Sequence, residues 1–369
     1  MNILLIEPYF TGSHKSWALG LQKRSTHQIN ILSLPGKFWK WRMHGGAVTL
    51  ARQFMDSDYT PDLILTTDML DLTTFLSLTR ERTSGIATAV YFHENQLSYP
   101  WSKTDRDVQN KRNIHYGFIN FTTALTANHV LFNSQYHMDS FLFEIRNMLK
   151  HFPDNNELTT IDTITSKSSV LHLGLDLLLF DQYRIDQLNH VPLLLWNHRW
   201  EYDKNPEAFF KVLLKLTERG LAFEVSILGE NFKRKPDVFD SAVRALGNKV
   251  VHNGYVENFK EYAEWLWKAD ILPVTSNQDF FGASIMEAIY CNTYPLLPNH
   301  LTYPELIPKK YHPSVIYNDL HDLEIKLESL IESKKYLSPK LRAVAKNYRW
   351  KNIISEYDSI FEQCRVKTL

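Results

Sequence analysis

Residues 2–15 read NILLIEPYFTGSHK, an apolar run followed by a turn and the start of a helical pattern. The run Asn2–Glu7 has the composition of a buried β-strand, and Trp17–Arg24 belongs to the helix that follows it. Apolar runs separated by longer helical segments recur along most of the chain, which predicts βαβ units and parallel sheets. The other predicted strands are Gln28–Leu32, Leu63–Thr66, Thr88–Phe92, Val130–Phe132 and Val170–Leu173, then Leu193–Trp196, Phe223–Leu228, Lys249–His252, Ile271–Val274 and Tyr294–Leu297.

These two sets of strands predict an α/β protein with two doubly wound parallel-sheet domains, and 369 residues suffice for about two domains. We expect a Rossmann-like domain over residues 1–188 and a second over residues 189–348, facing each other across a cleft. Residues 349–369 are expected to form a helix that packs back on the first domain, because its apolar residues share one face.

Composition excludes several classes of protein. With 44% hydrophobic and 13% aromatic residues, the chain is not disordered. The 41 basic residues cancel the 41 acidic ones, so no overall field attracts nucleic acid or membrane. Two cysteines provide neither a disulfide framework nor a thiolate zinc site. The N-terminus does not look like a signal peptide, and no apolar run is long enough to span a bilayer, so we expect a cytoplasmic protein without membrane contact.

Local charge is less even. Residues 1–52 contain seven basic residues and one acidic residue, Glu7. Within them, the run KFWKWR at 37–42 alternates cations with aromatic side chains. Such a mixture can neutralise phosphates through Lys37, Lys40 and Arg42 and stack a base on Trp39 or Trp41. The alternative is a solvated loop whose tryptophans cover the edge of the domain.

Two polar motifs follow predicted strands of the first domain. The turn Gly12-Ser13 opens a helix, where backbone N–H groups can bind an anion, although a plain tight turn has the same composition. The sequence HENQ at 93–96 follows the fourth strand, at the edge where ligands bind. It is not a zinc-protease motif, because position 97 is leucine, and its alternative is a helix N-terminus capped by Asn95.

Two further motifs belong to the second domain. Arg199 and Lys204 follow its first strand and can neutralise a diphosphate, or else form ion pairs with neighbouring acids. Between Asp279 and Glu287, a small-residue turn opens a short helix, whose first amides can bind phosphate. Glu287, one turn further along, can accept hydrogen bonds from a ribose, or it balances the helix dipole.

The acidic pairs Asp56/Asp58 and Asp105/Asp107 have metal-binding D-x-D spacing. Both occur in polar segments away from the predicted strand ends, so we interpret them as solvated charges and expect no metal.

At this point the sequence resembles the retaining glycosyltransferases of the GT-B fold, and within them the tRNA-queuosine α-mannosyltransferases. The resemblance extends almost from end to end, and GSHK and FHENQLxYP are the most specific to the subgroup. Asn292 departs from the family's usual glycine, but Asn tolerates the left-handed conformation required there. The resemblance rests on residues 6–15, 91–100, 132–141, 196–213, 225–232 and 279–298.

The resemblance implies a role for each matched residue. Arg199, Lys204 and the amides of Gly282, Ala283 and Ser284 would hold the donor diphosphate, and Glu287 the ribose. The other residues expected around the donor are Gly12, Ser13, Tyr255, Val256 and Phe281, with His93 and Asp279 beside the transferred sugar. The residues expected on the acceptor side are His14, Lys15, Lys37, Trp39, Lys40, Trp41, Arg42, Glu94 and Asn95.

The implied reaction moves mannose, with retention, from GDP-mannose to the queuosine nucleoside of a tRNA of the aspartate type. The expected partners are the nucleotide sugar and the tRNA, with no cofactor, no metal and no membrane. Two alternatives remain open: a related transferase using another nucleotide sugar and a lipid or glycan acceptor, and an inactive RNA-binding relative. The presence of both Glu287 and Arg199 argues against the inactive RNA-binding relative.

Overall fold

The computed structural model describes residues 1–102, 105–110, 114–186, 188–229, 236–336 and 338–366. It divides into two compact units, Met1–Leu175 with Trp350–Leu369, and Asp176–Arg349. The last three residues of the motif at 225–232 lie outside the described residues. In the described part of the chain, no helix combines the length and the apolar composition needed to cross a membrane.

The first unit is built on a six-stranded parallel sheet with the strand order β2-β1-β3-β4-β5-β6. Its central strands are buried along most of their length, as expected where helices cover both faces. The strands are β1 (Asn2–Phe10), β2 (Gln28–Pro35), β3 (Leu63–Thr67), β4 (Ala87–Phe92), β5 (His129–Phe132) and β6 (Ser168–Val170).

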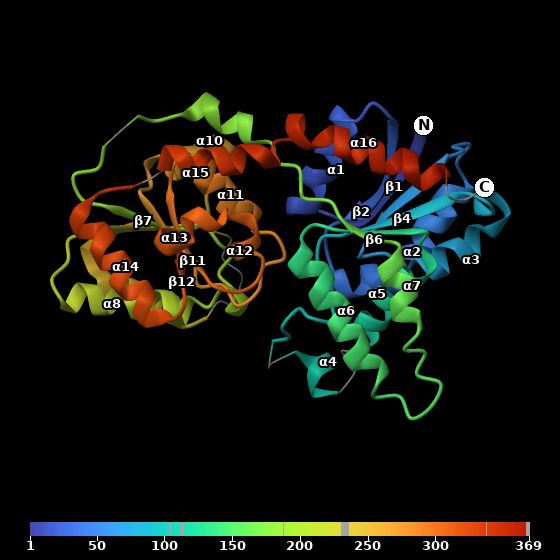
Figure 1. The fold of residues 1–369 in the computed structure, drawn as a ribbon, viewed down its shortest axis with the longest axis horizontal. Helices are drawn as coiled ribbons and strands as arrows, with labels where there is room; N and C mark the ends of the chain where they lie inside the picture. The colour runs from blue at the N-terminus through green and yellow to red at the C-terminus, as the bar shows by residue number, and fades with distance from the viewer. Residues whose placement is uncertain (103–104, 111–113, 187, 230–235, 337, 367–369) are drawn as a thin grey trace. The chain divides into compact units, whose positions relative to one another are not determined.

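Helices cover both faces of this sheet (Figure 1). One face carries α1 (Gly12–Arg24) and α16 (Trp350–Val366), which pack against each other. The opposite face carries α2 (Trp39–Met55), α3 (Leu72–Thr83), α5 (Ile114–Thr126), α6 (Gln135–Leu149) and α7 (Thr160–Ser166), and the short α4 (Arg106–Gln109) lies beyond them.

The second unit contains the other parallel sheet, with the order β12-β11-β10-β7-β8-β9. Counted from its own first strand, this is the 3-2-1-4-5-6 order of a Rossmann fold. The strands are β7 (Leu193–Trp196), β8 (Glu224–Ile227), β9 (Val250–Asn253), β10 (Ile271–Pro273), β11 (Tyr294–Pro298) and β12 (Ile316–Tyr317).

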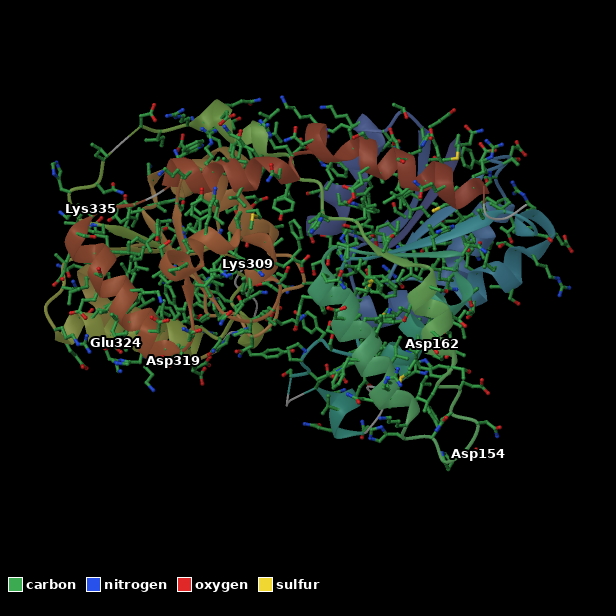
Figure 2. All side chains as sticks on the ribbon, in the orientation of Figure 1. Asp154, Asp162, Lys309, Asp319, Glu324 and Lys335 are labelled. Atoms are coloured by element: carbon green, nitrogen blue, oxygen red, sulfur yellow. The ribbon has the colours of Figure 1, made fainter. Side chains whose placement is uncertain are left out.

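Two helical layers cover this second sheet as well. One contains α8 (Pro206–Glu218), α9 (Val238–Leu246) and α14 (Leu320–Ser333). The buried Glu324 of α14, labelled in Figure 2, accepts from Lys215 of α8 and from Arg219 just after it, which joins the two helices. The other layer contains α10 (Phe259–Lys268), α11 (Ala283–Tyr290) and α15 (Ser338–Ala345). The short helices α12 (Tyr303–Leu306) and α13 (His312–Val315) follow β11.

The structure confirms the α/β fold class and the two parallel sheets, and it corrects details. The strand β12 was not predicted, because two residues carry too little pattern. The run 37–42 does not form a loop: from Trp39 onward it is the first turn of α2. Asn292 has a φ of 71°, the left-handed conformation expected of it.

The boundary between the units falls after Leu175, earlier than the expected boundary at residue 188. Residues 177–183 form a 3₁₀ helix that belongs to the second unit, because Phe180 packs there. The Phe180 ring lies 4.9 Å from that of Phe259, and its carbonyl accepts a 2.8 Å hydrogen bond from Trp267 Nε1.

The C-terminal helix α16 completes the core of the first unit. The Trp350 ring fills a space that exists because residues 20 and 174 are glycines, since a Cβ atom at these two positions would lie 2.3 and 2.5 Å from the ring. The Tyr357 hydroxyl accepts from Trp17 Nε1 at 3.1 Å and donates to the His172 carbonyl at 2.8 Å. Helix α16 is therefore part of the first unit's fold.

Candidate functional site

Each sheet has a point at which the strand order reverses: between β1 and β3 in the first unit, and between β7 and β10 in the second. Open α/β sheets bind ligands at the carboxyl ends of the strands that flank such a point. Three of the four predicted motifs begin there: residues 12–15 follow β1, residues 197–204 follow β7, and residues 279–287 come after β10.

In the second unit, the loops after β7 and β10 are bonded together. The Asn277 amide donates to the Asp203 carbonyl at 2.8 Å, and the Thr275 hydroxyl donates to the Lys204 carbonyl at 3.1 Å. Asn197 Nδ2 donates to the Ser284 carbonyl at 2.8 Å, which ties the first loop to α11. Two motifs that are far apart in sequence therefore form one polar cluster.

Lys204 lies at the centre of this cluster and is 8% exposed. Its Nζ is 2.9 Å from Asp279 Oδ1, 3.3 Å from Asp203 Oδ2 and 2.7 Å from the Gln278 carbonyl. Burial alone would lower the pKa of Lys204, but the charges of Asp279 and Asp203 hold it above its ordinary value. Lys204 is therefore a buried, fully charged cation.

Asp279 is held from two sides. Lys204 binds one oxygen, and the Tyr303 hydroxyl donates to the other. Burial alone would raise the pKa of Asp279, but chiefly the charge of Lys204 keeps it below its ordinary value. The carboxylate thus holds Lys204 in place, so any contact with a sugar would compete with these two bonds.

Arg199 lies on the same loop and is about half-exposed, with its guanidinium 3.1 Å from Glu201. The next residue, Trp200, anchors the loop: its ring stacks on Phe239 at 4.4 Å, and its Nε1 donates to the Leu228 carbonyl at 2.9 Å. The indole is almost fully buried, so the loop that carries Arg199 and Lys204 is fixed at its midpoint.

Gly282 directly precedes helix α11, and its φ of 81° favours glycine. In the described structure no side chain caps this helix end, and its first amides therefore remain available for an anion. One turn along, Glu287 Oε2 accepts a 2.8 Å hydrogen bond from the Tyr262 hydroxyl of α10. Burial raises the pKa of Glu287 to about 7, although the bond from Tyr262 opposes this shift.

Three more of the predicted donor residues, Tyr255, Val256 and Phe281, lie on the second unit. Tyr255 and Val256 follow β9; Tyr255 is 58% exposed, whereas Val256 is buried. Phe281 is buried, and its ring meets that of Tyr348 edge to face at 5.2 Å. Tyr255 can therefore stack on a planar ligand, whereas Phe281 shapes the turn from within.

In the first unit, a buried cluster contains polar residues from β1, from the start of α1 and from the ends of β3 and β4. His14 Nδ1 donates to Glu7 Oε2 at 3.0 Å, and the His14 ring lies 4.2 Å from that of His93. The His93 amide donates to Asp68 Oδ1 at 2.8 Å, and His93 Nε2 is buried without a partner among the described residues. Burial lowers the pKa of His93 well below its ordinary value, so its ring is neutral.

Glu7, His14 and His93 also offer a set of possible metal ligands, whose donor atoms lie within 4.8 Å of one another. Ligands of a tetrahedral zinc ion lie about 3.4 Å apart, so the set would have to contract. Burial alone would lower the pKa of His14, but the charge of Glu7 and the other carboxylates raises it to about 9. A protonated His14 already compensates Glu7, and we interpret the cluster as an ion pair.

The remaining residues of the first-domain motifs divide into exposed and buried ones. Gly12, Ser13 and Lys15 are exposed at the start of α1, where Gly12 has a φ of 50°. Asn95 is fully buried, and its Oδ1 accepts from the Leu97 and Ser98 amides, so it caps a turn. Glu94 is half-buried and accepts from Gln96 Nε2.

The basic and aromatic run 37–42 contains both packed and exposed residues. Lys40 Nζ binds Asp105 and Asp107, and Trp39 packs on Tyr116 with ring centroids 5.2 Å apart. The prediction that Asp105 and Asp107 are solvated charges was therefore wrong, because they hold Lys40. By contrast, Trp41 is 63% exposed, and Lys37 is exposed as well.

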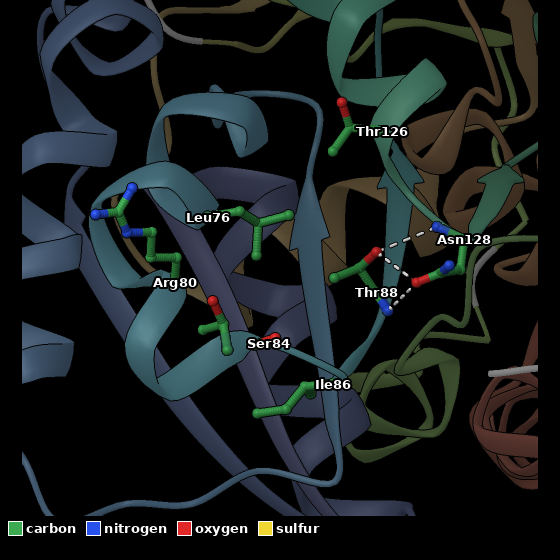
Figure 3. A pocket seen from close by; sticks show the side chains of 8 residues that line it. Leu76, Arg80, Ser84, Ile86, Thr88, Thr126 and Asn128 are labelled. Atoms are coloured by element: carbon green, nitrogen blue, oxygen red, sulfur yellow. Dashed lines mark hydrogen bonds between the residues drawn. The ribbon is translucent and has the colours of Figure 1, made fainter. Parts of the chain in front are cut away.

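An open hollow near the starts of β4 and β5 lies away from these motifs. Thr88 and Asn128 line it and bond each other, with Leu76 and Arg80 from α3 nearby (Figure 3). Ligands of α/β sheets bind at the other ends of the strands, so we assign this hollow no role.

Comparison with known proteins agrees with this geometry. Residues 2–175 match the family model described as tRNA-queuosine alpha-mannosyltransferase N-terminal, and residues 185–350 match glycosyl transferases group 1. The tRNA-queuosine alpha-mannosyltransferase of Drosophila melanogaster is 32% identical over 98% of this chain and 97% of its own length.

The chain belongs to the tRNA-queuosine alpha-mannosyltransferase family. It is therefore a glycosyltransferase. Two solved structures share its fold: sucrose-phosphate synthase from Thermosynechococcus elongatus (TM-score 0.71, 13% identity, 98% of both chains) and Anabaena HepE in complex with UDP (TM-score 0.65, 12% identity, 100% of both chains). Both are similar in fold alone.

The site also contains polar residues that were not predicted from the sequence. Tyr262 holds Glu287, Asn197 ties α11 to the loop after β7, and Glu7 and Asp68 surround the two histidines. A signal existed for Glu7, which is a charged residue inside an apolar strand. Tyr262 carried none, because it lies within an ordinary amphipathic helix.

Proposed function

We propose that this protein transfers mannose from GDP-mannose, with retention of configuration, to the queuosine nucleoside of tRNA. The observation that carries the proposal is the bonded cluster of Lys204, Asp279 and the start of α11 at the switch point of the second sheet. A buried cation beside uncapped helix amides is suited to a diphosphate. The family membership and the near full-length Drosophila relative support the sugar and the acceptor.

In this mechanism the second unit stabilises the leaving group. Negative charge accumulates on the nucleoside diphosphate as its bond to the sugar breaks, and Lys204, Arg199 and the α11 amides stabilise that charge. The acceptor hydroxyl attacks from the face that the diphosphate leaves, and a phosphate oxygen takes the hydroxyl proton. This route retains configuration without a nucleophilic carboxylate on the protein.

His93 is proposed to bind a hydroxyl of the transferred sugar. Its Nε2 is buried without a partner among the residues the structure describes, and such an atom costs free energy until a ligand satisfies it. Because the ring is neutral, it can accept or donate a hydrogen bond according to its tautomer.

Replacing Glu287 by alanine is expected to weaken binding of GDP about 10- to 150-fold, because a charged acceptor for the ribose hydroxyls is lost, a change of about 1.5–3 kcal/mol. Titration calorimetry of the purified protein measures this change. Tyr262→Phe keeps the Glu287 carboxylate but removes the hydrogen bond that it accepts from Tyr262. This variant should lose less affinity, and the pKa of Glu287 that governs the pH dependence of binding should rise. Unchanged GDP affinity in Glu287→Ala would exclude the ribose assignment.

The direct test of the function is transfer of labelled mannose to tRNA that carries or lacks queuosine, with GDP-mannose, UDP-glucose and UDP-galactose as competing donors. Transfer from GDP-mannose to the queuosine-bearing tRNA alone is expected. It should persist in excess EDTA, since Lys204 and Arg199 supply the positive charge. If EDTA abolishes transfer and Mg²⁺ or Mn²⁺ restores it, the metal-independent mechanism is wrong. If transfer occurs only from a UDP-sugar, the assignment of GDP-mannose as the donor is wrong.

A further inference from the structure

The segment that enters α2 carries two exposed aromatic rings. Phe38 is 77% exposed and Trp41 63% exposed, which is unusual for side chains of this size. Phe38 is the residue that directly precedes α2, and Trp41 lies in the first turn of that helix, so the two rings belong to one short segment. Phe38 has a φ of 56°, a conformation that costs a bulky residue free energy and needs support from its surroundings.

The indole of Trp41 lies against residue 45, one turn further along α2, and it fits there because that residue is glycine. A Cβ atom on Gly45 would lie 2.6 and 2.7 Å from two atoms of the indole, so the ring rests on the backbone of the next turn. Trp41 is nevertheless 63% exposed, so much of its surface is open to solvent. A glycine in a helix interior costs about 1 kcal/mol relative to alanine, and here it makes room for the ring.

The segment that carries these rings is held in place. Arg42 Nε donates to the Pro35 carbonyl at 3.0 Å, and the Lys37 amide donates to the same carbonyl at 2.8 Å. Gly36 packs against Thr11 of the turn after β1, where a Cβ atom would lie 2.3 Å from the Thr11 side chain. The rings are thus displayed on a fixed support.

The inward half of the same turn has a different role. Trp39 packs on Trp101 and Tyr116, and Lys40 is bound by two carboxylates, so both residues stabilise the unit. The outward half combines two aromatic faces with the cations Lys37 and Arg42, and a single acidic residue occurs in the first 52 residues. This combination is typical of surfaces that bind single-stranded nucleic acid.

We propose that Phe38 and Trp41 form a stacking platform for unpaired bases of the acceptor tRNA's loop, with Lys37 and Arg42 beside the phosphates. The inference rests on the proposed function, which supplies an RNA acceptor. Unpaired bases expose their faces, whereas duplex bases do not, so two open rings favour a loop over a stem. A membrane would instead favour a continuous apolar face, but exposed His44 and Arg52 lie on the same helix.

The test measures binding of an anticodon stem–loop RNA by fluorescence anisotropy at two salt concentrations. Phe38→Ala and Trp41→Ala should each weaken binding about 5- to 150-fold, with little change in the salt dependence, because stacking is not electrostatic. Lys37→Ala should instead reduce the slope of log affinity against log salt by about 0.7. Phe143→Ala removes an equally exposed ring from α6 and is the matched control, expected to have no effect.

Gly45→Ala best separates a role of Trp41 in RNA binding from a role in folding. Its methyl group displaces the indole, so RNA binding should fall as in Trp41→Ala, while the melting temperature stays equal or rises through better helix propensity. A structural role for Trp41 alone would lower the melting temperature and leave RNA affinity unchanged.

The outcomes separate the platform from the proposed function. Wild-type RNA affinity in both Trp41→Ala and Gly45→Ala would overturn the platform, even if mannose transfer to tRNA is confirmed. RNA binding that these variants lose, without any mannose transfer by the wild type, would support the platform and overturn the function. Binding to vesicles with 30% anionic lipid, with no binding to the RNA, would overturn the platform in favour of a membrane surface.

Discussion

Replacing Lys204 by methionine is expected to lower the rate of sugar transfer about 10²- to 10³-fold, the range observed when a preorganised charge-stabilising group is removed from an active site. Lys204 supplies a buried positive charge, and Asn197 ties the loop that carries it to the uncapped helix α11. Single-turnover kinetics with saturating donor isolates this effect from changes in binding.

The same variant should also lose stability, by about 3–5 kcal/mol, since it leaves Asp203 and Asp279 buried without their cation. The double variant Lys204→Met/Asp279→Asn removes one of these charges and should recover most of the stability but not the activity. Lys211→Met, which removes an exposed lysine from the same unit, is the control. Recovery of transfer to within tenfold of the wild type in the double variant would mean that Lys204 acts only on folding.

The second large effect is the dependence of folding stability on pH, and it comes from the Glu7–His14 pair. The pKa of His14 is about 9 in the folded protein and about 6.5 when unfolded, so folding holds its proton more tightly. The resulting stabilisation, about 3 kcal/mol, is complete below pH 6.5 and is lost as the pH rises through 9. Asp68, whose pKa burial raises to about 8, titrates in the same direction.

Urea unfolding at several values between pH 6 and pH 9.5 measures this dependence. In Glu7→Gln the shape of the pair is kept and its charge is removed, so burial should leave His14 neutral and flatten the pH dependence. Asp58→Asn, which removes an exposed carboxylate from the same unit, should preserve the wild-type dependence. An equal loss of stability with pH in Glu7→Gln would show that the pair does not hold the proton.

The fold could be predicted from the sequence because its signals are local. Each buried parallel strand is a short apolar run, and the alternation with helical segments survives even where boundaries shift, as in β6 and β9. The polar motifs after β7 and β10 could be found for a similar reason, since the ends of these strands meet wherever the two strands are neighbours.

What the sequence did not predict depends on contacts between distant segments. Lys40 has the same composition around it as Lys37, and only the tertiary fold brings Asp105 and Asp107 to one of them. The hydroxyl of Tyr262 reaches Glu287 through packing of α10 on α11, and no spacing in the chain encodes that. Phe38 was overlooked because its exposure depends on a left-handed backbone that bulky residues rarely adopt.

The return of α16 to the first unit has a consequence for biosynthesis. Trp350 and Tyr357 fill the core beside Trp17 and Tyr91, so the first unit cannot finish folding until the ribosome has made the whole of Asp176–Arg349. At roughly 5–20 residues per second, that delay is about 9 to 35 s. The second unit is continuous in sequence and can fold during this interval. Chains that terminate before residue 350 leave an apolar surface uncovered on the first unit, and they are natural clients for chaperones and proteases.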